Sequence, residues 1–270
     1  MSTLAILCCV SFLSGLIDSI AGGGGLVQVP VLFLMLPHTA VPAILGTNKL
    51  VSFSGTAFAT WRYARHVRVE WRATLPGTAV AFMFSVLGSW VVTQIRSDVL
   101  RPVVLVLLVL VAVYTFVNKG FGETHAPKLG RGHELLVSVL AGMVIGFYDG
   151  FFGPGTGSLL MFVFVSLFGF SFLSASASTK VVNATTNTAA LITFALTGNI
   201  IYRLAVPMAA CNVLGAFAGT HLAILKGSRF VRIVFLCVVS AIILKLVYDT
   251  EAAQAALVAL RQIALHDVAD

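Results

Sequence analysis

The chain has 270 residues, of which 59% are hydrophobic and only 10% are charged, and its mean hydropathy is +1.00. Soluble domains carry about 25% charged residues, so the composition excludes a soluble globular protein and predicts a multi-pass protein whose main partner is the lipid bilayer. The formal net charge of +7 is typical of loops that set membrane orientation, and no nucleic-acid partner is predicted.

Apolar segments follow one another along the chain, and most have the length of about 17–25 residues that a spanning helix needs. They cover residues 4–21, 26–36, 41–60, 73–95, 99–117, 135–152, 159–173, 174–197, 204–225 and 230–247. The segments 26–36 and 159–173 are short and predict broken or re-entrant helices. The alanine-rich stretch 251–265 predicts an interfacial helix. We therefore predict an all-α integral membrane protein with eight to ten membrane segments.

An internal repeat is predicted, because residue types that are rare in this chain recur at a fixed offset of 131 residues. The coinciding pairs are Asp18 and Asp149, Gly22 and Gly153, Gly24 and Gly155, Lys49 and Lys180, Arg72 and Arg203, Pro76 and Pro207, Gly88 and Gly219, and Arg101 and Arg232. The predicted units are a repeat at 1–118, a polar linker at 119–134, a second repeat at 135–248 and a tail at 249–270. Duplicated halves are the construction of many secondary transporters, in which the binding site lies between the halves.

Basic loops predict how the two repeats are oriented in the membrane. With five crossings in each repeat, the loops 62–72 and 226–232 share one face with the linker, which gives 10 basic residues on that face against 3 on the other. With four crossings in each repeat, the count is 8 against 5. The charge bias therefore favours five crossings and inverted repeats. The 11 residues of 26–36 rise only about 17 Å as a helix, which favours a segment that dips into the membrane, so we predict inverted repeats and leave eight or ten crossings open.

Two stretches combine one acidic residue in an apolar helix with a glycine break, at corresponding places in the predicted repeats. An ionised carboxylate inside a membrane costs several kcal/mol unless it is paired or faces water. Bare backbone at that depth is tolerated only where protein or a water-filled cavity covers it. The combination predicts a path for a polar solute, although close helix packing is an alternative role for the glycines. The residues are Asp18 with Gly22, Gly23, Gly24 and Gly25, and Asp149 with Gly153, Gly155 and Gly157.

Each predicted repeat also places one lysine and two hydrogen-bonding residues on a single face of an apolar helix. These residues are Lys49, Ser52 and Thr56 in the first repeat and Lys180, Asn183 and Asn187 in the second. Their common spacing of i, i+3 and i+7 puts the three side chains on one helical face. Helices that begin near Gly25 and Gly157 would add free backbone N–H groups and positive dipole ends. We predict that these side chains and the glycines of both breaks bind a small anion such as sulfite, a sulfonate, phosphate or a carboxylate.

The same residues also have structural interpretations, which the sequence leaves open. Asp18 and Asp149 either neutralise Lys49 and Lys180 as ion pairs or have a role in proton coupling or gating. The two lysines either contact the substrate or only form such pairs and snorkel. The amide and hydroxyl side chains either bind the substrate or join neighbouring helices.

Motifs of an enzyme or an ATP-driven pump are missing from the sequence. There is no H-E-x-x-H motif, and the four cysteines stand in apolar runs without C-x-x-C spacing. The four consecutive glycines are not followed by G-K-[ST], so they do not form a nucleotide-binding loop. We therefore predict a carrier without cofactor or metal, and the alternatives are a membrane-embedded enzyme and an anion channel. The direction of transport, proton or ion coupling and homo-oligomerisation stay open.

Four motifs carry a family resemblance that covers about residues 4–248. They are Gly22-Gly23-Gly24-Gly25 with the apolar run to Pro30, Gly46-Thr47-Asn48-Lys49, Gly153-Pro154-Gly155-Thr156-Gly157, and Ser176-Ala177-Ser178-Thr179-Lys180-Val181-Val182-Asn183. Together they resemble the TauE/SafE, or sulfite exporter, family of bacterial and archaeal membrane permeases. The resemblance implies a secondary transporter of the bacterial inner membrane that moves sulfite, sulfonates or related organic anions. Pro154 and Thr156 interrupt the second glycine run, so its backbone donors are expected to differ from those of the first.

Overall fold

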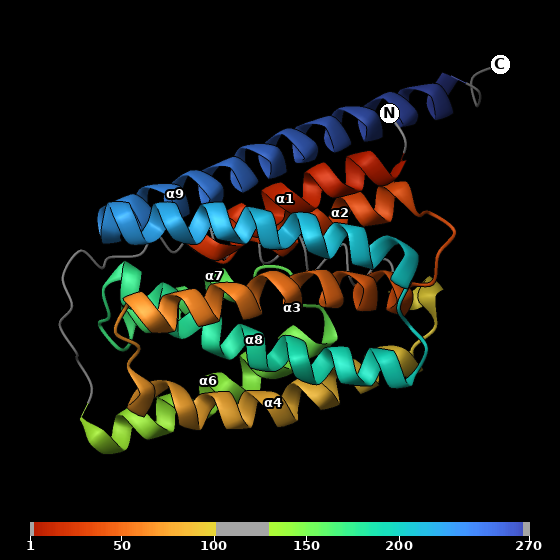
Figure 1. The fold of residues 1–270 in the computed structure, drawn as a ribbon. Helices are drawn as coiled ribbons and strands as arrows, with labels where there is room; N and C mark the ends of the chain where they lie inside the picture. Colours follow the sequence, from red (N-terminus) through yellow and green to blue (C-terminus); the bar gives the residue numbers. More distant parts are fainter. Residues whose placement is uncertain (1–2, 101–129, 267–270) are drawn as a thin grey trace.

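The computed structural model describes residues 3–100 and 130–266, and all regular structure within them is α-helical. The helices are α1 (Thr3–Ala21), α2 (Gly24–Met35), α3 (Val41–His66), α4 (Trp71–Gln94), α6 (Arg131–Phe151), α7 (Thr156–Ser166), α8 (Phe172–Leu196) and α9 (Tyr202–His266) (Figure 1). Two helical stretches make up α9, because Gly227 between them is non-helical (φ 70°, ψ −168°) and the chain reverses there. The all-α prediction is confirmed. Most of the predicted segment 99–117 and of the linker lies outside the described residues.

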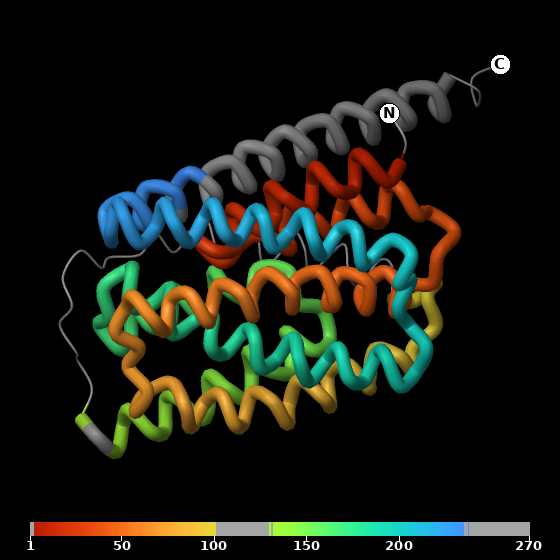
Figure 2. The backbone as a smooth tube through the Cα atoms, viewed as in Figure 1, coloured from red at the N-terminus to blue at the C-terminus, as the bar shows by residue number. Residues whose placement is uncertain are grey.

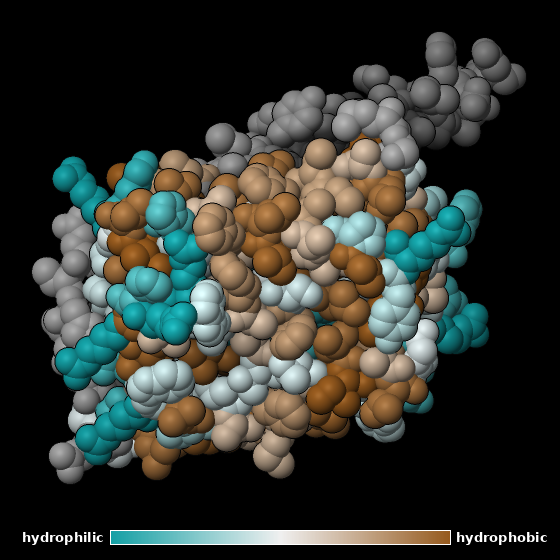
Figure 3. Space-filling view, in the orientation of Figure 1, coloured by the Kyte–Doolittle hydropathy of each residue, from teal (hydrophilic) through white to brown (hydrophobic). Residues whose placement is uncertain are grey.

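Four helices are long and apolar enough to cross a membrane: Thr3–Ala21, Trp71–Gln94, Gly132–Phe151 and Tyr202–Val234. All four expose large apolar side chains, an arrangement that is unfavourable in water and favourable against lipid tails. In Figure 3 hydrophobic residues form a broad belt, and hydrophilic residues gather at the two ends of the molecule. This distribution is that of a multi-pass membrane protein, as the composition predicts.

The central helices α3 and α8 are long but more polar. They have 26 and 25 residues, and they lie between α1 and α9 on one side and α4 and α6 on the other (Figure 1). Because protein surrounds them, their polar side chains do not have to face lipid. The sequence predicts both as apolar segments, at 41–60 and 174–197; the structure makes them the inner layer that carries the polar stripes.

The two short helices are confirmed, although one of the predicted boundaries is wrong. α2 has 12 residues and α7 has 11, but the apolar segment predicted at 159–173 continues beyond the end of α7 at Ser166. Gly169 has a φ of 78°, which breaks the helix, and Ser171 caps the next one by accepting a hydrogen bond from the Ser174 N–H. The intervening Phe168 and Phe170 are buried, so composition alone could not distinguish this turn from a helix.

The chain turns back after α1, as Figure 2 traces. α2 returns beside α1, where Gly24 packs against the backbone of Ser14. α3 then begins beside the end of α4, since the Val41 N–H donates a hydrogen bond to Ser97 Oγ (3.1 Å). A pair of helices that enters and leaves the membrane at the same end places the later loops on the same sides as two full crossings would. The short length of α2 and the charge bias of the loops therefore no longer conflict.

Two basic regions lie at one end of the molecule. Ser174 Oγ donates to the Arg68 carbonyl (3.1 Å) and the Leu173 N–H donates to Ser228 Oγ (3.3 Å), so the α3–α4 turn, the start of α8 and the kink of α9 meet. α6 begins at the same end and runs beside α4, whereas α1 begins at the opposite end (Figure 1). These directions are those expected of inverted halves, here α1–α4 and α6–α9. The sequence repeat itself and the total number of crossings stay predictions.

Small residues allow α4 and α6 to touch along their backbones. A Cβ on Gly77 would lie 2.6 Å from the Ser138 carbonyl oxygen, and one on Gly142 would collide with the Gly77 backbone. Ser138 Oγ accepts from the Gly77 N–H (2.9 Å) and donates to the Ala73 carbonyl (2.6 Å). In an uninterrupted helix the Gly77 N–H would donate to the Ala73 carbonyl. Here the Ser138 hydroxyl bonds to both groups instead, and so stabilises α4 beside Pro76.

Ser138→Ala is expected to lower the free energy of unfolding by about 1–3 kcal/mol, because two buried backbone groups of α4 lose a partner on α6. Thermal unfolding in detergent micelles measures the change. Ser54→Ala is the matched control, since Ser54 Oγ donates only within its own helix, to the Leu50 carbonyl (2.9 Å), and we expect a change below about 0.5 kcal/mol. Equal losses in the two variants would contradict a bridging role for Ser138.

Candidate functional site

The turns that follow α1 and α6 are made by glycines in the left-handed region of backbone space. Gly22 has a φ of 79°, Gly153 of 95° and Gly155, the N-cap residue of α7, of 84°. Residues with a Cβ adopt such angles only with strain. The predicted glycine breaks are therefore true interruptions of the helices, and the residue type is required at these positions.

The two glycine breaks touch each other. A Cβ on Gly22 would lie 2.7 Å from the Gly157 Cα, and one on Gly25 would lie 3.0 Å from the Pro154 Cα. The N-termini of α2 and α7 are consequently neighbours, and neither is capped by a side-chain hydrogen bond. Two adjacent helix N-termini attract negative charge. Close packing, the structural alternative for the glycines, also holds at Gly22 and Gly157.

Lys49 on α3 is buried and forms an ion pair with the second half of the chain. Its Nζ lies 2.9 Å from Asp149 Oδ1 on α6, and the two side chains are 2% and 4% exposed. The same Nζ donates to Asn187 Oδ1 on α8 (3.1 Å). A buried cation is stable only with such partners, so Lys49 joins three helices.

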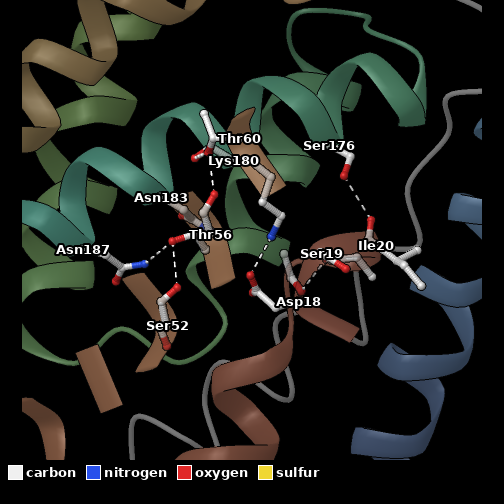
Figure 4. A network of polar contacts seen from close by, with 12 residues as sticks. Asp18, Ser19, Ile20, Ser52, Thr56, Thr60, Ser176, Lys180, Asn183 and Asn187 are labelled. Atoms are coloured by element: carbon white, nitrogen blue, oxygen red, sulfur yellow. Dashed lines mark hydrogen bonds and ion pairs between the residues drawn. The ribbon is translucent and has the colours of Figure 1, made fainter. Parts of the chain in front are cut away.

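Lys180 on α8 forms the reciprocal pair with the first half. Its Nζ lies 2.8 Å from Asp18 Oδ2 on α1 (Figure 4). The Lys180 side chain is fully buried, whereas that of Asp18 is 22% exposed, so this pair is partly accessible. Each lysine is thus neutralised by the aspartate of the other half, which supports the ion-pair interpretation of the four residues without excluding a further role.

The hydroxyl side chains of Ser52 and Thr56 on α3 face the amide side chains of Asn183 and Asn187 on α8. Asn187 Nδ2 donates to Thr56 Oγ1 (3.4 Å), and Thr56 Oγ1 donates to the Ser52 carbonyl (2.8 Å) (Figure 4). Thr60 Oγ1, one turn further along α3, donates to the Lys180 carbonyl (2.8 Å). These contacts show that the predicted stripes meet across the two halves, as residues that join helices would.

A small cavity lies where the stripes, the ion pairs and the glycine breaks come together. Its volume of about 30 Å³ has room for about two water molecules, so it is smaller than an organic sulfonate. The lining residues are Asp18, Gly22, Gly25, Asn48, Lys49, Ser52, Thr56, Asp149, Gly153, Gly155, Thr156, Gly157, Asn183 and Asn187.

Three residues of the predicted set do not line this cavity. Lys180 is separated from it by its partner Asp18, which does line it. Gly23 is the N-cap residue of α2, and Gly24 packs against Ser14 and the Cβ of Asp18. These two glycines shape the turn from outside the cavity.

Two lining residues, Asn48 and Thr156, are absent from the predicted set. Asn48 stands four residues before Ser52, so helical spacing could have placed it on the same stripe. Thr156 Oγ1 donates to the Gly153 carbonyl (2.7 Å), which puts a hydroxyl where the first break has Gly25. The expected difference between the backbone donors of the two breaks stays a prediction.

Several polar atoms around the cavity have no hydrogen-bond partner among the described residues. They include Asp149 Oδ2, Asn48 Oδ1 and Asn183 Oδ1, all on residues that are at most 5% exposed. Buried acceptors without donors are rare and costly, so these three atoms set the cavity apart from the fully paired polar contacts around it. No cluster of three metal-ligating side chains occurs in the part of the chain that the structure describes.

Comparison with known proteins connects this geometry to a family. A family model described as "Sulfite exporter TauE/SafE" matches residues 7–246. The chain is 36% identical over 249 residues to the "Probable membrane transporter protein YfcA" of Escherichia coli, covering 92% of this chain and 90% of the relative. It is 35% identical over 248 residues to a "Probable membrane transporter protein" of Haemophilus influenzae, covering 91% and 95%. A search of solved structures gave no match.

Proposed function

Because the chain belongs to the TauE/SafE family of membrane transporters, we propose that it is a secondary carrier that binds a small anion between its two halves. The family description names sulfite, and we infer sulfite or a sulfonate as the substrate. The family and the relatives' names also confirm the prediction of a transporter over a membrane-embedded enzyme. Direction and coupling are separate questions.

One observation supports the proposal: buried Lys49 lines a polar cavity between the halves, and buried Lys180 pairs with Asp18, which lines the same cavity. Intramembrane charges are costly and usually mark a substrate path. The uncapped N-termini of α2 and α7 add positive potential at the same place. Lysine ammonium groups, backbone N–H groups and neutral donors are together suited to a tetrahedral or pyramidal oxyanion.

The conformation with both ion pairs formed corresponds to the carrier without bound substrate. A cavity of about 30 Å³ cannot admit a sulfonate while Asp149 and Asp18 hold the lysines. Binding therefore requires that the anion take the place of at least one carboxylate and that the halves move apart. An opening of this kind between two halves is the motion expected of alternating access, whereas a channel needs a continuous path.

Transport assays on the two lysines test the proposal. Cells that express Lys49→Ala or Lys180→Ala are expected to lose at least tenfold in saturable uptake or efflux of labelled sulfite and taurine. The reason is that a charge-assisted hydrogen bond contributes about 1.5–3 kcal/mol, which corresponds to about ten- to hundredfold in affinity. Lys226→Ala removes an exposed lysine that contacts only Phe230 among the contacts described for it, and it should transport as the unmodified protein does.

Binding to the purified protein identifies the anion. We expect sulfite, or one of the sulfonates taurine and methanesulfonate, to raise the unfolding temperature in a concentration-dependent manner. Sulfate and acetate provide the comparison for charge and shape. Well-folded variants of both lysines that transport and bind normally would remove these residues from the site and refute the proposal.

A further inference from the structure

The two ion pairs differ in a way that the predicted repeat does not suggest. Asp18 is 22% exposed in its side chain, so water can hydrate its charge, whereas Asp149 is 4% exposed. Asp149 uses Oδ1 for Lys49, and its Oδ2 has no hydrogen-bond partner among the described residues. A buried carboxylate oxygen without a donor is a costly arrangement. The two aspartates therefore have different surroundings.

The neighbourhood of Asp149 can receive a proton. Asn48 and Asn183 line the same cavity, are 3% and 5% exposed, and each has an unpartnered Oδ1. An amide oxygen can accept a hydrogen bond from the O–H group of a protonated carboxyl, and these two line the same cavity as Asp149. The cavity also has room for about two waters, which provide a route for the proton.

The charges around the cavity sum to zero before an anion arrives. The titratable groups that surround Asp149 are Lys49 on α3, Asp18 on α1, Lys180 on α8 and Tyr148 on α6 itself. α2 and α7 contain no titratable side chain, and the charged residue of α4, Arg72, is exposed. An anion that entered alone would leave one uncompensated negative charge in a desolvated space.

We propose, on the basis of the proposed function, that Asp149 is the proton-binding group of the carrier and that one proton enters with each monovalent anion. The proton enters from the outside solution, is relayed through the cavity waters, which stay neutral, and binds Oδ2. The Lys49–Asp149 ion pair is then replaced by a neutral acid and a free ammonium, and the anion takes the place of the carboxylate beside Lys49. Lys49 keeps its own proton, so the charge within the cavity is unchanged.

A sodium ion fits this place less well than a proton. The unpartnered Oδ2 belongs to a carboxylate whose other oxygen lies 2.9 Å from the Lys49 ammonium, so a metal cation there would be repelled at short range. Sodium would also leave the Lys49–Asp149 pair intact and the ammonium occupied. Protonation neutralises the acid and releases the lysine in one step.

Infrared difference spectroscopy tests the protonation without any substrate. Acidifying the purified protein should produce a protonated-carboxyl band that is retained in Asp18→Asn and missing in Asp149→Asn. Asp149→Glu keeps a carboxyl group at this place and should shift the band rather than remove it, which identifies the residue even if Asp149→Asn folds poorly. A band that is unaffected by both Asp149 variants would overturn the proposal.

Transport in proteoliposomes tests the coupling, with methanesulfonate as the probe because it is ionised at every pH used. An inward acid gradient should stimulate uptake at least tenfold in the unmodified protein and in Asp149→Glu, and the residual exchange of Asp149→Asn should no longer respond to pH. Dependence on sodium, or an undiminished gradient response in Asp149→Asn, would overturn the proposal. A protein that moves none of methanesulfonate, sulfite and taurine would instead refute the proposed function, and the infrared result would still decide the role of Asp149.

Discussion

Lys49→Met is expected to lower the free energy of unfolding by about 3–5 kcal/mol. The replacement leaves the Asp149 carboxylate buried without its cation, since both side chains are at most 4% exposed, and breaking a buried pair from one side has about this cost. Asn187 also loses the donor to its Oδ1. Thermal unfolding in detergent, with the same micelle and lipid content, measures the loss.

The double variant Lys49→Met/Asp149→Leu separates stability from function. Replacing both members of a buried pair by apolar side chains is often neutral or stabilising, so we expect it to recover most of the stability that Lys49→Met loses. It should still fail to respond to sulfite or methanesulfonate in the thermal-shift assay, because the cation is gone. Lys226→Met serves as the control for loss of one positive charge, since Lys226 is exposed. If the double variant were as unstable as the single one, the pair would not be the source of the effect.

The polar residues of the site could be predicted from the sequence because an apolar membrane protein offers few places for them. Charges inside the hydrophobic belt must pair or face water, so Lys49, Lys180 and the two aspartates had to be close to one another or to a cavity. The helical spacing of Ser52 and Thr56 then fixed which face of α3 turns inward. The structure brings these side chains together as that argument requires.

The pairing across the halves could not be predicted in the same way. Periodicity gives the face of one helix, but the partner on another helix depends on how the two are rotated and shifted in three dimensions. Lys49 meets Asp149, and Lys180 meets Asp18; pairs within each half would have satisfied the sequence equally well. The difference in exposure between the two aspartates is likewise set by packing, so two positions that the predicted repeat equates have different surroundings in the structure.

The boundary at the end of α7 illustrates a second limit. Phe168 and Phe170 are buried in the apolar core, and their composition resembles that of the helix before them. Only the positive φ of Gly169 and the cap at Ser171 end the helical run. A single glycine in an apolar stretch is common in membrane helices, and therefore does not by itself predict a turn.

Gly22→Ala is expected to destabilise the protein by about 2–5 kcal/mol, because it combines two unfavourable effects. The φ of 79° is strained for alanine by about 1–2 kcal/mol. The added Cβ would also lie 2.7 Å from the Gly157 Cα, and overpacking typically costs about 1–3 kcal/mol. Thermal unfolding in detergent is again the measurement, and loss of folded protein would be the extreme form of the same result.

Three other glycines separate the two effects of Gly22→Ala. Gly157→Ala tests the contact alone, since its Cβ would lie 2.5 Å from the Gly22 Cα and no positive φ is involved. Gly198→Ala tests the strain alone, because its φ is 69° and the space around it is open. Gly132→Ala has neither effect and should change stability by less than about 1 kcal/mol. If Gly22→Ala cost no more than Gly198→Ala, the two halves would not be in tight contact at the glycine breaks.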